Sequence, residues 1–204
     1  MTALAGGVRW QDVRLRHGAV LLRPVVRRDR KEWQDARRRN VAWLTPWEAT
    51  RPPSDPLPPL SFGGMVRDLR RQAREGRALP LALTVDGRFA GQVTVSNVVG
   101  GSARFGSVGY WIDRRHAGHG YMPLAVAMTI DHCFSGMGLH RVEIAIRPEN
   151  AASLRVVEKL GIKEYGYAPK YLHIDGAWRD HRLFAVTVEE LVGHRGMLDL
   201  LLSP

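Results

Sequence analysis

The sequence contains a single cysteine, Cys133, among its 204 residues. One thiol excludes an intrachain disulfide, and structural zinc sites usually need several cysteines or clustered cysteine and histidine. Cys133 stands beside Phe134 in an apolar helical pattern, so we interpret it as a buried structural thiol rather than a nucleophile. Of the eight histidines, only His116 and His119 have a metal-like spacing, and no third candidate ligand is near them. The sequence therefore predicts no metal site.

Long hydrophobic runs are also missing. None reaches the ~18 uninterrupted apolar residues that a membrane span needs, and residues 1–7 contain neither a basic leader nor a long apolar stretch. We therefore expect a cytoplasmic protein without a membrane segment. With 45% hydrophobic residues, the chain can bury a substantial core. We expect one domain over residues 20–188, preceded by an extension over 1–19 and followed by a helical tail over 189–204.

Lysine is scarce, since only 4 of the 30 basic residues are lysine, and the formal net charge of +10 comes from arginine. The charge is uneven along the chain. Residues 1–80 hold 17 basic and 8 acidic residues, whereas the remainder holds 13 and 12. This asymmetry favours an anionic partner such as ribosomal RNA or a phosphorylated cofactor. The alternative is that these arginines lie on solvated helix faces.

The apolar spacing and turn signals predict an α+β protein with a mixed sheet. The expected strands cover residues 20–23, 81–85, 89–97, 104–112, 140–146 and 178–188. The expected helices cover 30–40, capped by Asp29, and 61–76, 121–134, 150–160 and 189–202. Asp86-Gly87 is a strong hairpin signal, and six prolines over residues 46–59 predict a loop with restricted conformations.

The segment Ala117-Gly118-His119-Gly120-Tyr121-Met122 joins an expected strand to an expected helix. With two side chains absent, such a turn can bring backbone N–H groups close to an anion at the positive end of the helix. A P-loop is excluded because no Gly-Lys-Ser/Thr follows, and a dinucleotide fingerprint is excluded because the third glycine is missing. The segment predicts a pyrophosphate site; taken alone, a tight helix entry without a ligand is the alternative.

A second motif begins about thirty residues further along, where a strand over 140–146 is followed by a helix that starts near Asn150. Asn150 is a natural helix cap. Ser153, one turn later, lies on the same helix face and can present its hydroxyl to a bound group. Together the two residues predict a polar edge beside the glycine turn.

In this pair of motifs the chain resembles the GNAT superfamily of N-acetyltransferases, whose acetyl-CoA site joins a Q/R-x-x-G-x-G/A loop to a following strand and helix. The resemblance covers residues 20–188. More narrowly, the segments Pro46-Trp47-Glu48, 108–112, 150–153 and 171–181 are similar to ribosomal-protein-alanine N-acetyltransferases of the RimJ/RimL type. In the register of the loop, Ala117 replaces the usual Gln or Arg and Met122 the usual Gly or Ala, whereas Arg115 is two positions out of step.

The resemblance implies a GNAT fold, with a mostly antiparallel sheet of about seven strands flanked by helices and a cofactor cleft between two splayed central strands. It implies direct acetyl transfer from acetyl-CoA to a primary amine, most simply the α-amino group of a protein, which we expect to be ribosomal. The residues expected to bind acetyl-CoA are Trp111, Ile112, Ala117, Gly118, His119, Gly120, Tyr121, Met122, Asn150 and Ser153.

The resemblance also implies roles in catalysis. Ser153 is expected to donate to the leaving sulfur, and a backbone N–H near Ile112 to stabilise the oxyanion. Proton removal is open between a water chain, Glu143 and Glu48, with Glu48 also able to hold an ammonium group and Tyr171 an alternative proton donor. A structural salt bridge at Glu143 and a surface carboxylate at Glu48 are the competing interpretations. His173 and His181, eight residues apart in the late segment, are interpreted as packing or hydrogen-bonding residues.

Two other functions stay open at this stage. One is acetylation of a small amine such as an aminoglycoside or a polyamine. The other is a non-catalytic GNAT module that binds RNA or the ribosome through its arginines; Ala117 and Met122 favour it, whereas Asn150 and Ser153 oppose it. A homodimer is a further open possibility, for which the proline-rich loop and the carboxy-terminal tail are candidate contacts.

Overall fold

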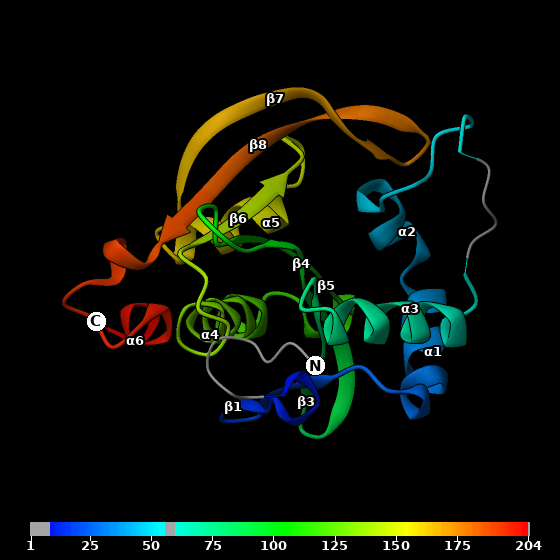
Figure 1. Cartoon of the computed structure of the whole chain (residues 1–204). Helices are drawn as coiled ribbons and strands as arrows, with labels where there is room; N and C mark the ends of the chain where they lie inside the picture. Colours follow the sequence, from blue (N-terminus) through cyan, green and yellow to red (C-terminus); the bar gives the residue numbers. More distant parts are fainter. Residues whose placement is uncertain (1–8, 56–59, 204) are drawn as a thin grey trace.

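A single eight-stranded sheet forms the centre of the computed structural model, which describes residues 9–55 and 60–203 (Figure 1). The strands are β1 Leu15–His17, β2 Val20–Pro24, β3 Leu79–Val85, β4 Arg88–Val99, β5 Phe105–Ile112, β6 Arg141–Ile146, β7 Lys163–Ile174 and β8 Ala177–Thr187. Their order in the sheet is β1-β2-β3-β4-β5-β6-β8-β7, and only β5 and β6 pair in parallel. The expected α+β class with a mixed, mostly antiparallel sheet is confirmed.

Six α-helices and five short 3₁₀ turns surround the sheet in the described part of the chain. The helices are α1 Arg30–Arg39, α2 Val41–Leu44, α3 Phe62–Arg74, α4 Tyr121–Ser135, α5 Ala151–Lys159 and α6 Met197–Leu202. The 3₁₀ turns are η1 Trp10–Asp12, η2 Arg27–Asp29, η3 Thr45–Trp47, η4 Arg114–His116 and η5 Val188–Leu191. Over the residues described, no helix combines the length and the apolar character that crossing a membrane requires.

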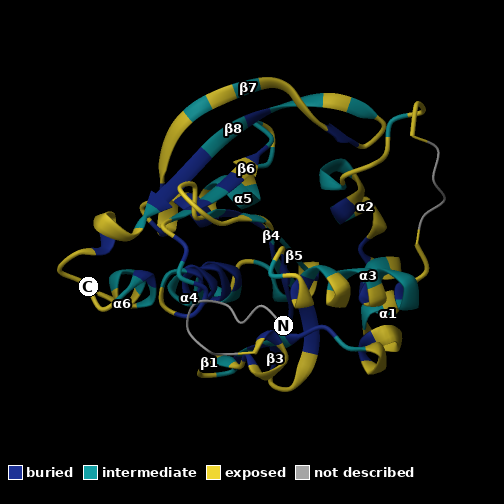
Figure 2. Cartoon of the chain, viewed as in Figure 1, coloured by how far each residue is buried: buried dark blue, intermediate teal, exposed yellow. Residues whose placement is uncertain are grey.

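The alternation of side chains along the strands divides the core between the two faces of the sheet. Leu81 and Leu83 of β3 join the larger apolar cluster, which includes most of α4, whereas Ala82 between them joins a smaller cluster with residues of α1 and α3. Figure 2 shows α4 as one of the most deeply buried helices. Cys133 of α4 is fully buried, and burial raises the pKa of its thiol to about 12, as expected for a structural cysteine.

The strands β5 and β6 pair over three residues only and then separate. The first pair is Phe105 with Arg141, and the last is Ser107 with Glu143. Beyond Ser107, β4 is the one described strand that pairs with the remainder of β5, so the other edge of β5 has no strand partner there. The expected cleft between two splayed central strands is confirmed.

Two hairpins shape the surroundings of this opening. The β3–β4 turn is the predicted Asp86-Gly87 pair, and both residues have the positive φ values, 48° and 77°, of a type I′ turn. The long β7–β8 hairpin arches over the sheet toward the segment after α2 (Figure 1), and Ala49 bridges to Ile174 near its tip.

The structure differs from the expectations at both ends of the chain. Trp10 and Val13 are buried in the larger cluster and β1 pairs with β2, so the expected boundary at residue 20 falls inside the packed domain. In the tail, the prediction of a continuous helix over 189–202 is wrong. The turn η5 and the helix α6 are separated by a segment in which Gly193 and Gly196 have φ values of 93° and 141°. Such values are incompatible with a right-handed helix.

The predicted cap of α1 is also wrong. Asp29 makes no side-chain cap at α1; its carboxylate instead accepts hydrogen bonds from Arg23, at 2.7 and 2.9 Å, and from the Val26 amide. Ser61 does cap α3, accepting from the Gly64 amide at 3.2 Å. Residues 1–8 of the expected extension, residues 56–59 of the proline-rich loop and residue 204 lie outside the described residues.

Candidate active site

The loop between β5 and α4 is held open by two glycines. Gly118 and Gly120 have φ values of 82° and 79°, which L-residues rarely adopt, and a Cβ at either position would meet no atom of a residue beyond its chain neighbours within 4 Å. Gly120 immediately precedes α4, a helix of 15 residues that no side chain caps in the described chain. The first-turn N–H groups of α4 therefore form an anion-binding end of the kind that suits a pyrophosphate.

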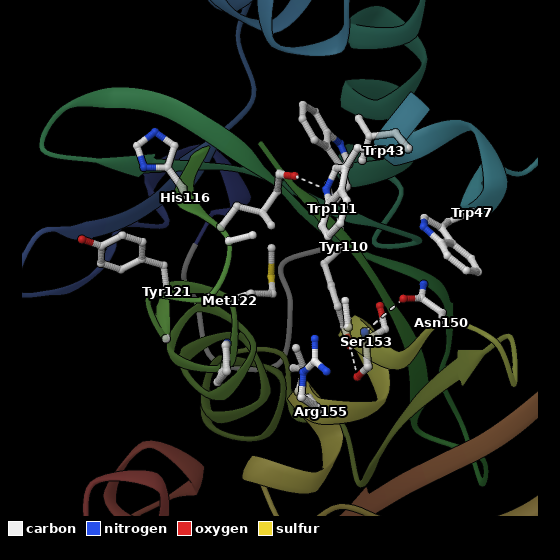
Figure 3. Close-up of a pocket in the computed structure, with 18 of the residues that line it drawn as sticks. Trp43, Trp47, Tyr110, Trp111, His116, Tyr121, Met122, Asn150, Ser153 and Arg155 are labelled. Carbon is white, nitrogen blue, oxygen red and sulfur yellow. Dashed lines mark hydrogen bonds between the residues drawn. The ribbon is translucent and has the colours of Figure 1, made fainter. Parts of the chain in front are cut away.

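A cavity of about 550 Å³ extends from this loop along the open end of β5 to α5 (Figure 3). It is lined by Arg37, Trp43, Leu44, Trp47, Glu48, Ala49, Tyr110, Trp111, Ile112, His116, Ala117, Gly118, Gly120, Tyr121, Met122, Pro123, Asn150, Ala152, Ser153, Arg155, Val156 and Lys159. Nine of the ten residues expected to bind acetyl-CoA are in this lining. Their assignment as cofactor contacts stays a prediction.

His119 is the expected cofactor residue that is absent from the lining. Its ring stacks on Tyr121 with centroids 5.7 Å apart and an interplanar angle of 13°, and its Nδ1 lies 2.9 Å from the Ala117 carbonyl oxygen. Its neighbour His116 does line the cavity. Among the residues described, no three His, Cys, Asp or Glu side chains are grouped as metal ligands.

Two basic residues of α5, Arg155 and Lys159, line the cavity and were missed from the sequence. They are four positions apart, and with Ala152 and Val156 they form one stripe of the helix. This helical spacing is the signal that would have found them, because it continues from the polar start of α5. The two cations give this side of the cavity a charge suited to phosphate groups.

Ser153 is fixed at the start of α5 through its backbone. Its amide donates to Asn150 Oδ1 at 3.1 Å, as predicted for a helix cap, and its carbonyl accepts from the Tyr110 hydroxyl at 3.4 Å. Burial raises the pKa of Tyr110, the larger effect, while the hydrogen bond to Ser153 opposes the rise. Within the described residues the Ser153 hydroxyl has no protein partner, so it is available to a ligand.

The buried carboxylate of Asp113 anchors the segment that leads into the glycine loop. Burial alone would raise its pKa, but hydrogen bonds from Arg115, Arg39 and Asn40 outweigh this and hold the pKa well below its usual value. Arg115 Nη2 lies 2.9 Å from the carboxylate, and Arg115 is not in the lining of the cavity. The arginine that a literal loop pattern would select therefore supports the loop from outside.

The predicted proton-transfer residues lie in three different settings. Glu48 lines the cavity, but its carboxylate is paired with Arg37, whose guanidinium also lies 5.3 Å from the Trp111 ring centroid. Glu143 accepts from Arg141 Nε at 2.7 Å and lines neither cavity of the site. Tyr171 is 48% exposed and is likewise outside both linings. The structure brings only Ser153 and Glu48 of this set into the cavity.

A second cavity, of about 230 Å³, lies beside the first between β5, β6 and the β7–β8 hairpin. It is lined by Trp47, Ala49, Val108, Gly109, Tyr110, Ile144, Ala145, Ile146, Arg147, Asn150, Ser153, Leu172, Ile174 and His181. Five of these residues, Trp47, Ala49, Tyr110, Asn150 and Ser153, also line the larger cavity. The two cavities therefore meet at Tyr110 and Ser153.

The hairpin is latched over the smaller cavity by the segment that follows η3. Thr50 Oγ1 lies 2.8 Å from His173 Nδ1 and accepts from the Gly176 amide at 3.0 Å. Arg147, which follows β6, contacts η3: it donates to the Pro46 carbonyl at 2.7 Å, and its guanidinium lies over the Trp47 ring. These contacts join residues far apart in the sequence into one wall.

The arrangement defines a class of enzyme. An anion-binding glycine loop, an open strand edge that leads away from it, and a second chamber where that edge meets Ser153 together suit a transferase that uses an acyl-coenzyme A thioester. The glycine loop would hold the phosphates of the coenzyme, the open strand edge its extended pantetheine arm, and the second chamber the acceptor.

Comparisons with known proteins agree with this class. The family model described as an acetyltransferase (GNAT) domain matches residues 19–163. The chain belongs to the GNAT acetyltransferase family and is an N-acetyltransferase, as the sequence motifs predicted.

Individual relatives extend the match over most of the chain. The [Ribosomal protein uS5]-alanine N-acetyltransferase of Escherichia coli (strain K12) is 32% identical over 182 residues, covering 87% of this chain and 92% of that protein. The structure of Mycobacterium smegmatis RimJ in complex with CoA-disulfide has 38% sequence identity and a TM-score of 0.82, covering 93% of this chain and 92% of that one. The match to the probable N-acetyltransferase YjcK of Bacillus subtilis (strain 168), at 37% identity, spans 50% of this chain and only 56% of that protein.

Proposed function

We propose that this acetyltransferase acts on the α-amino group of a protein, with a small uncharged residue such as alanine at the amino terminus and a ribosomal protein as the substrate. The E. coli relative named for alanine acetylation of ribosomal protein uS5 matches over 87% of the chain. The geometry of the smaller cavity supports a small residue at the amino terminus of the substrate. Its volume of about 230 Å³ and its mostly apolar walls fit a small side chain next to the amine.

The larger cavity is the proposed site for acetyl-CoA, whose thioester supplies the activated acetyl group. The amides of the Gly118–Gly120 loop and the start of α4 would hold the pyrophosphate, and Arg155 and Lys159 add positive charge nearby. The backbone at Trp111 and Ile112 would align the pantetheine arm. Trp43 Nε1 donates to the Ile112 carbonyl at 3.2 Å, which fixes this end of β5 against α2 (Figure 3).

Ser153 is the proposed donor to the departing sulfur. Its backbone is fixed by Asn150 and Tyr110, while its hydroxyl has no protein partner in the described chain. A donor held in place before the reaction stabilises the charge that develops on sulfur without a cost of reorganisation. No covalent enzyme intermediate is required.

Small polycationic amines fit the acceptor cavity less well. Of the described residues that line it, none is Asp or Glu, and Arg147 is the one with a fixed charge. Glu48, which a polyamine would need, is already neutralised by Arg37. The non-catalytic alternative is opposed by the open glycine loop and by the free Ser153 hydroxyl. Association with the ribosome through the basic amino-terminal half and a homodimer stay predictions.

The test is a comparison of acceptors. The protein is incubated with acetyl-CoA and a peptide that starts with Ala, the same peptide with a blocked amino terminus, or spermidine; thiol release and product mass are measured. We expect one acetyl group on the free Ala peptide alone. Faster transfer to spermidine, or acetylation of the blocked peptide, would contradict the proposal. Ser153→Ala should lower kcat about 10-fold to 100-fold with an unchanged Kd for acetyl-CoA.

A further inference from the structure

One nitrogen of the His181 imidazole is hydrogen-bonded to the protein, and the other has no hydrogen-bond partner in the described chain. His181 lies in β8 and is only 3% exposed, and its Nδ1 lies 3.0 Å from the Arg179 carbonyl oxygen. A carbonyl can only accept, so Nδ1 carries the hydrogen and Nε2 of the neutral ring carries the lone pair. In the described chain no protein group hydrogen-bonds Nε2.

This lone pair is not sealed inside the protein. In the described chain, three side-chain nitrogens are both fully buried and without a hydrogen-bond partner; they belong to Trp33, His132 and Arg179. Nε2 of His181 also has no partner but is not among these fully buried atoms, so it is accessible. His181 lines the smaller cavity, the one that meets the acetyl-CoA cavity at Tyr110 and Ser153. A nearly buried imidazole therefore opens onto the space proposed for the acceptor amine.

Other candidates for proton removal are less available. Glu48 is paired with Arg37, and Glu143 is paired with Arg141 outside the cavity. His173, on the neighbouring strand, has its Nδ1 engaged by Thr50 and does not line the cavity. Among the described residues that line the smaller cavity, His181 is the one whose side chain can accept a proton near neutral pH.

We propose that His181 is the general base of acetyl transfer, a role that depends on the acceptor reaction proposed above. The neutral amine attacks the thioester carbon, and as the C–N bond forms, one N–H proton passes to Nε2, directly or through one water. The C–S bond breaks with its electron pair on sulfur. The imidazolium then returns its proton to solvent, from which the thiolate is protonated, so the sum is amide plus coenzyme A thiol.

The surroundings keep the ring neutral at pH 7. Burial, the largest effect, lowers the pKa of His181; the Arg179 hydrogen bond raises it, nearby Arg147 lowers it further, and Asp180 and Glu149 act in the opposite direction, with a net decrease. The Tyr171 ring, packed edge-on with centroids 5.7 Å apart, completes the surroundings. A base must be unprotonated before the reaction, and this balance favours that state.

The decisive variant is His181→Asn, because the Asn amide nitrogen can take the position of Nδ1 and keep the donor to Arg179 while Nε2 is lost. With a free Ala peptide we expect kcat to fall about 100-fold. The Kd for acetyl-CoA and the thermal unfolding midpoint should match the wild type. His132→Asn removes a half-buried imidazole of α4 that lines neither cavity, and should keep wild-type kcat.

The pH dependence of kcat/KM separates a base from a packing residue. In the wild type, log kcat/KM should fall with slope one as the amine is protonated below pH ~8, and with slope two at lower pH, once His181 is also protonated. In His181→Asn the slope should stay at one throughout. A variant with the slope and kcat of the wild type would overturn the role of His181.

A second measurement needs no acceptor and therefore separates this role from the choice of substrate. Nitrogen-15 NMR of the wild-type protein should show His181 as the neutral Nδ1–H tautomer at pH 7, with a pKa below 6.5. An Nε2–H tautomer or an imidazolium at pH 7 would overturn the proposal. If the tautomer is as expected but no peptide is acetylated, the proposed acceptor fails, and the slope comparison with the amine that is accepted decides the role of His181.

Discussion

The Asn40 side-chain Nδ2 donates to the Asp113 carboxylate over 3.0 Å, and the side-chain Oδ1 of Asn40 in turn accepts from the Arg114 backbone amide at the same distance. These two bonds join the end of α1 to the segment that enters the glycine loop. Both residues are buried, with Asp113 fully enclosed and Asn40 3% exposed. The position of the proposed phosphate site therefore depends on a contact between residues that are 73 positions apart.

Asp113→Asn should lower the free energy of unfolding by about 3 kcal/mol at pH 7, because the substitution removes the charge and turns one acceptor into a donor that faces either Arg39, at the Oδ2 position, or Asn40, at the Oδ1 position. The folded-state pKa of Asp113 lies below that of the unfolded chain. The ionised carboxylate therefore stabilises the fold above pH ~4, and this contribution is lost as the pH falls through the folded-state pKa.

Urea unfolding of both proteins between pH 7 and pH 3 checks this prediction: the difference between them should shrink below pH 4. Asp12→Asn is the matched control, since Asp12 pairs with Arg9 at the surface with both side chains more than half exposed. Its effect should stay within about 0.5 kcal/mol. If the difference in free energy of unfolding between the wild type and Asp113→Asn grew toward acid pH, the ionised state assigned to Asp113 would be contradicted.

Gly120→Ala should weaken acetyl-CoA binding more than 10-fold, whereas Gly18→Ala should leave it unchanged. Both glycines have positive φ values, 79° and 53°, and open space around an added Cβ, so each substitution should cost about 1 kcal/mol of stability from backbone strain. Only Gly120 lines the larger cavity. Calorimetric titration with acetyl-CoA beside thermal unfolding separates the two effects; equal Kd values for the two variants would remove Gly120 from the cofactor site.

Thr50→Val should raise the KM for the peptide about 5-fold and leave the Kd for acetyl-CoA unchanged. The substitution keeps the shape of the side chain but removes the hydroxyl that bonds His173 and Gly176, so the β7–β8 hairpin loses its hydrogen bonds to the segment beside the proposed acceptor cavity. Thr129→Val is the control, because its hydroxyl bonds only the Ala125 carbonyl within α4. Steady-state kinetics should show an unchanged peptide KM for Thr129→Val; a shift of similar size in both variants would indicate a general loss of stability.

Several local features of the fold could be predicted because their signals lie close together in the sequence. The glycine loop, the Asn150 cap and the Asp86-Gly87 turn each depend on residues within a few positions of one another, so backbone preferences reveal them directly. The same local reasoning failed at Asp29, where a cap and an ion pair with Arg23 are both compatible with the sequence. The pairing with the preceding strand decided between them.

The smaller cavity was harder to predict because its residues come from distant segments. The smaller cavity joins Ala49, Ile144 and His181, which only the crossing of the β7–β8 hairpin over the splayed strands brings together. From the sequence, His181 was interpreted as a packing or hydrogen-bonding residue. No periodicity reveals that one of its nitrogens is held by Arg179 while the other opens into a cavity.

The sequence by itself determined the α+β class and the place of the glycine loop, since these follow from short-range backbone and side-chain preferences, and the resemblance of its motifs gave the family. Only the tertiary structure decided which charged groups are available for chemistry. Arg37 neutralises Glu48, Arg141 holds Glu143 outside the cavity, and Asp113 engages Arg115. The reason is physical: a carboxylate or an imidazole takes its protonation state and its reach from the groups packed around it, and the folded backbone decides which of the nearby groups its side chain meets.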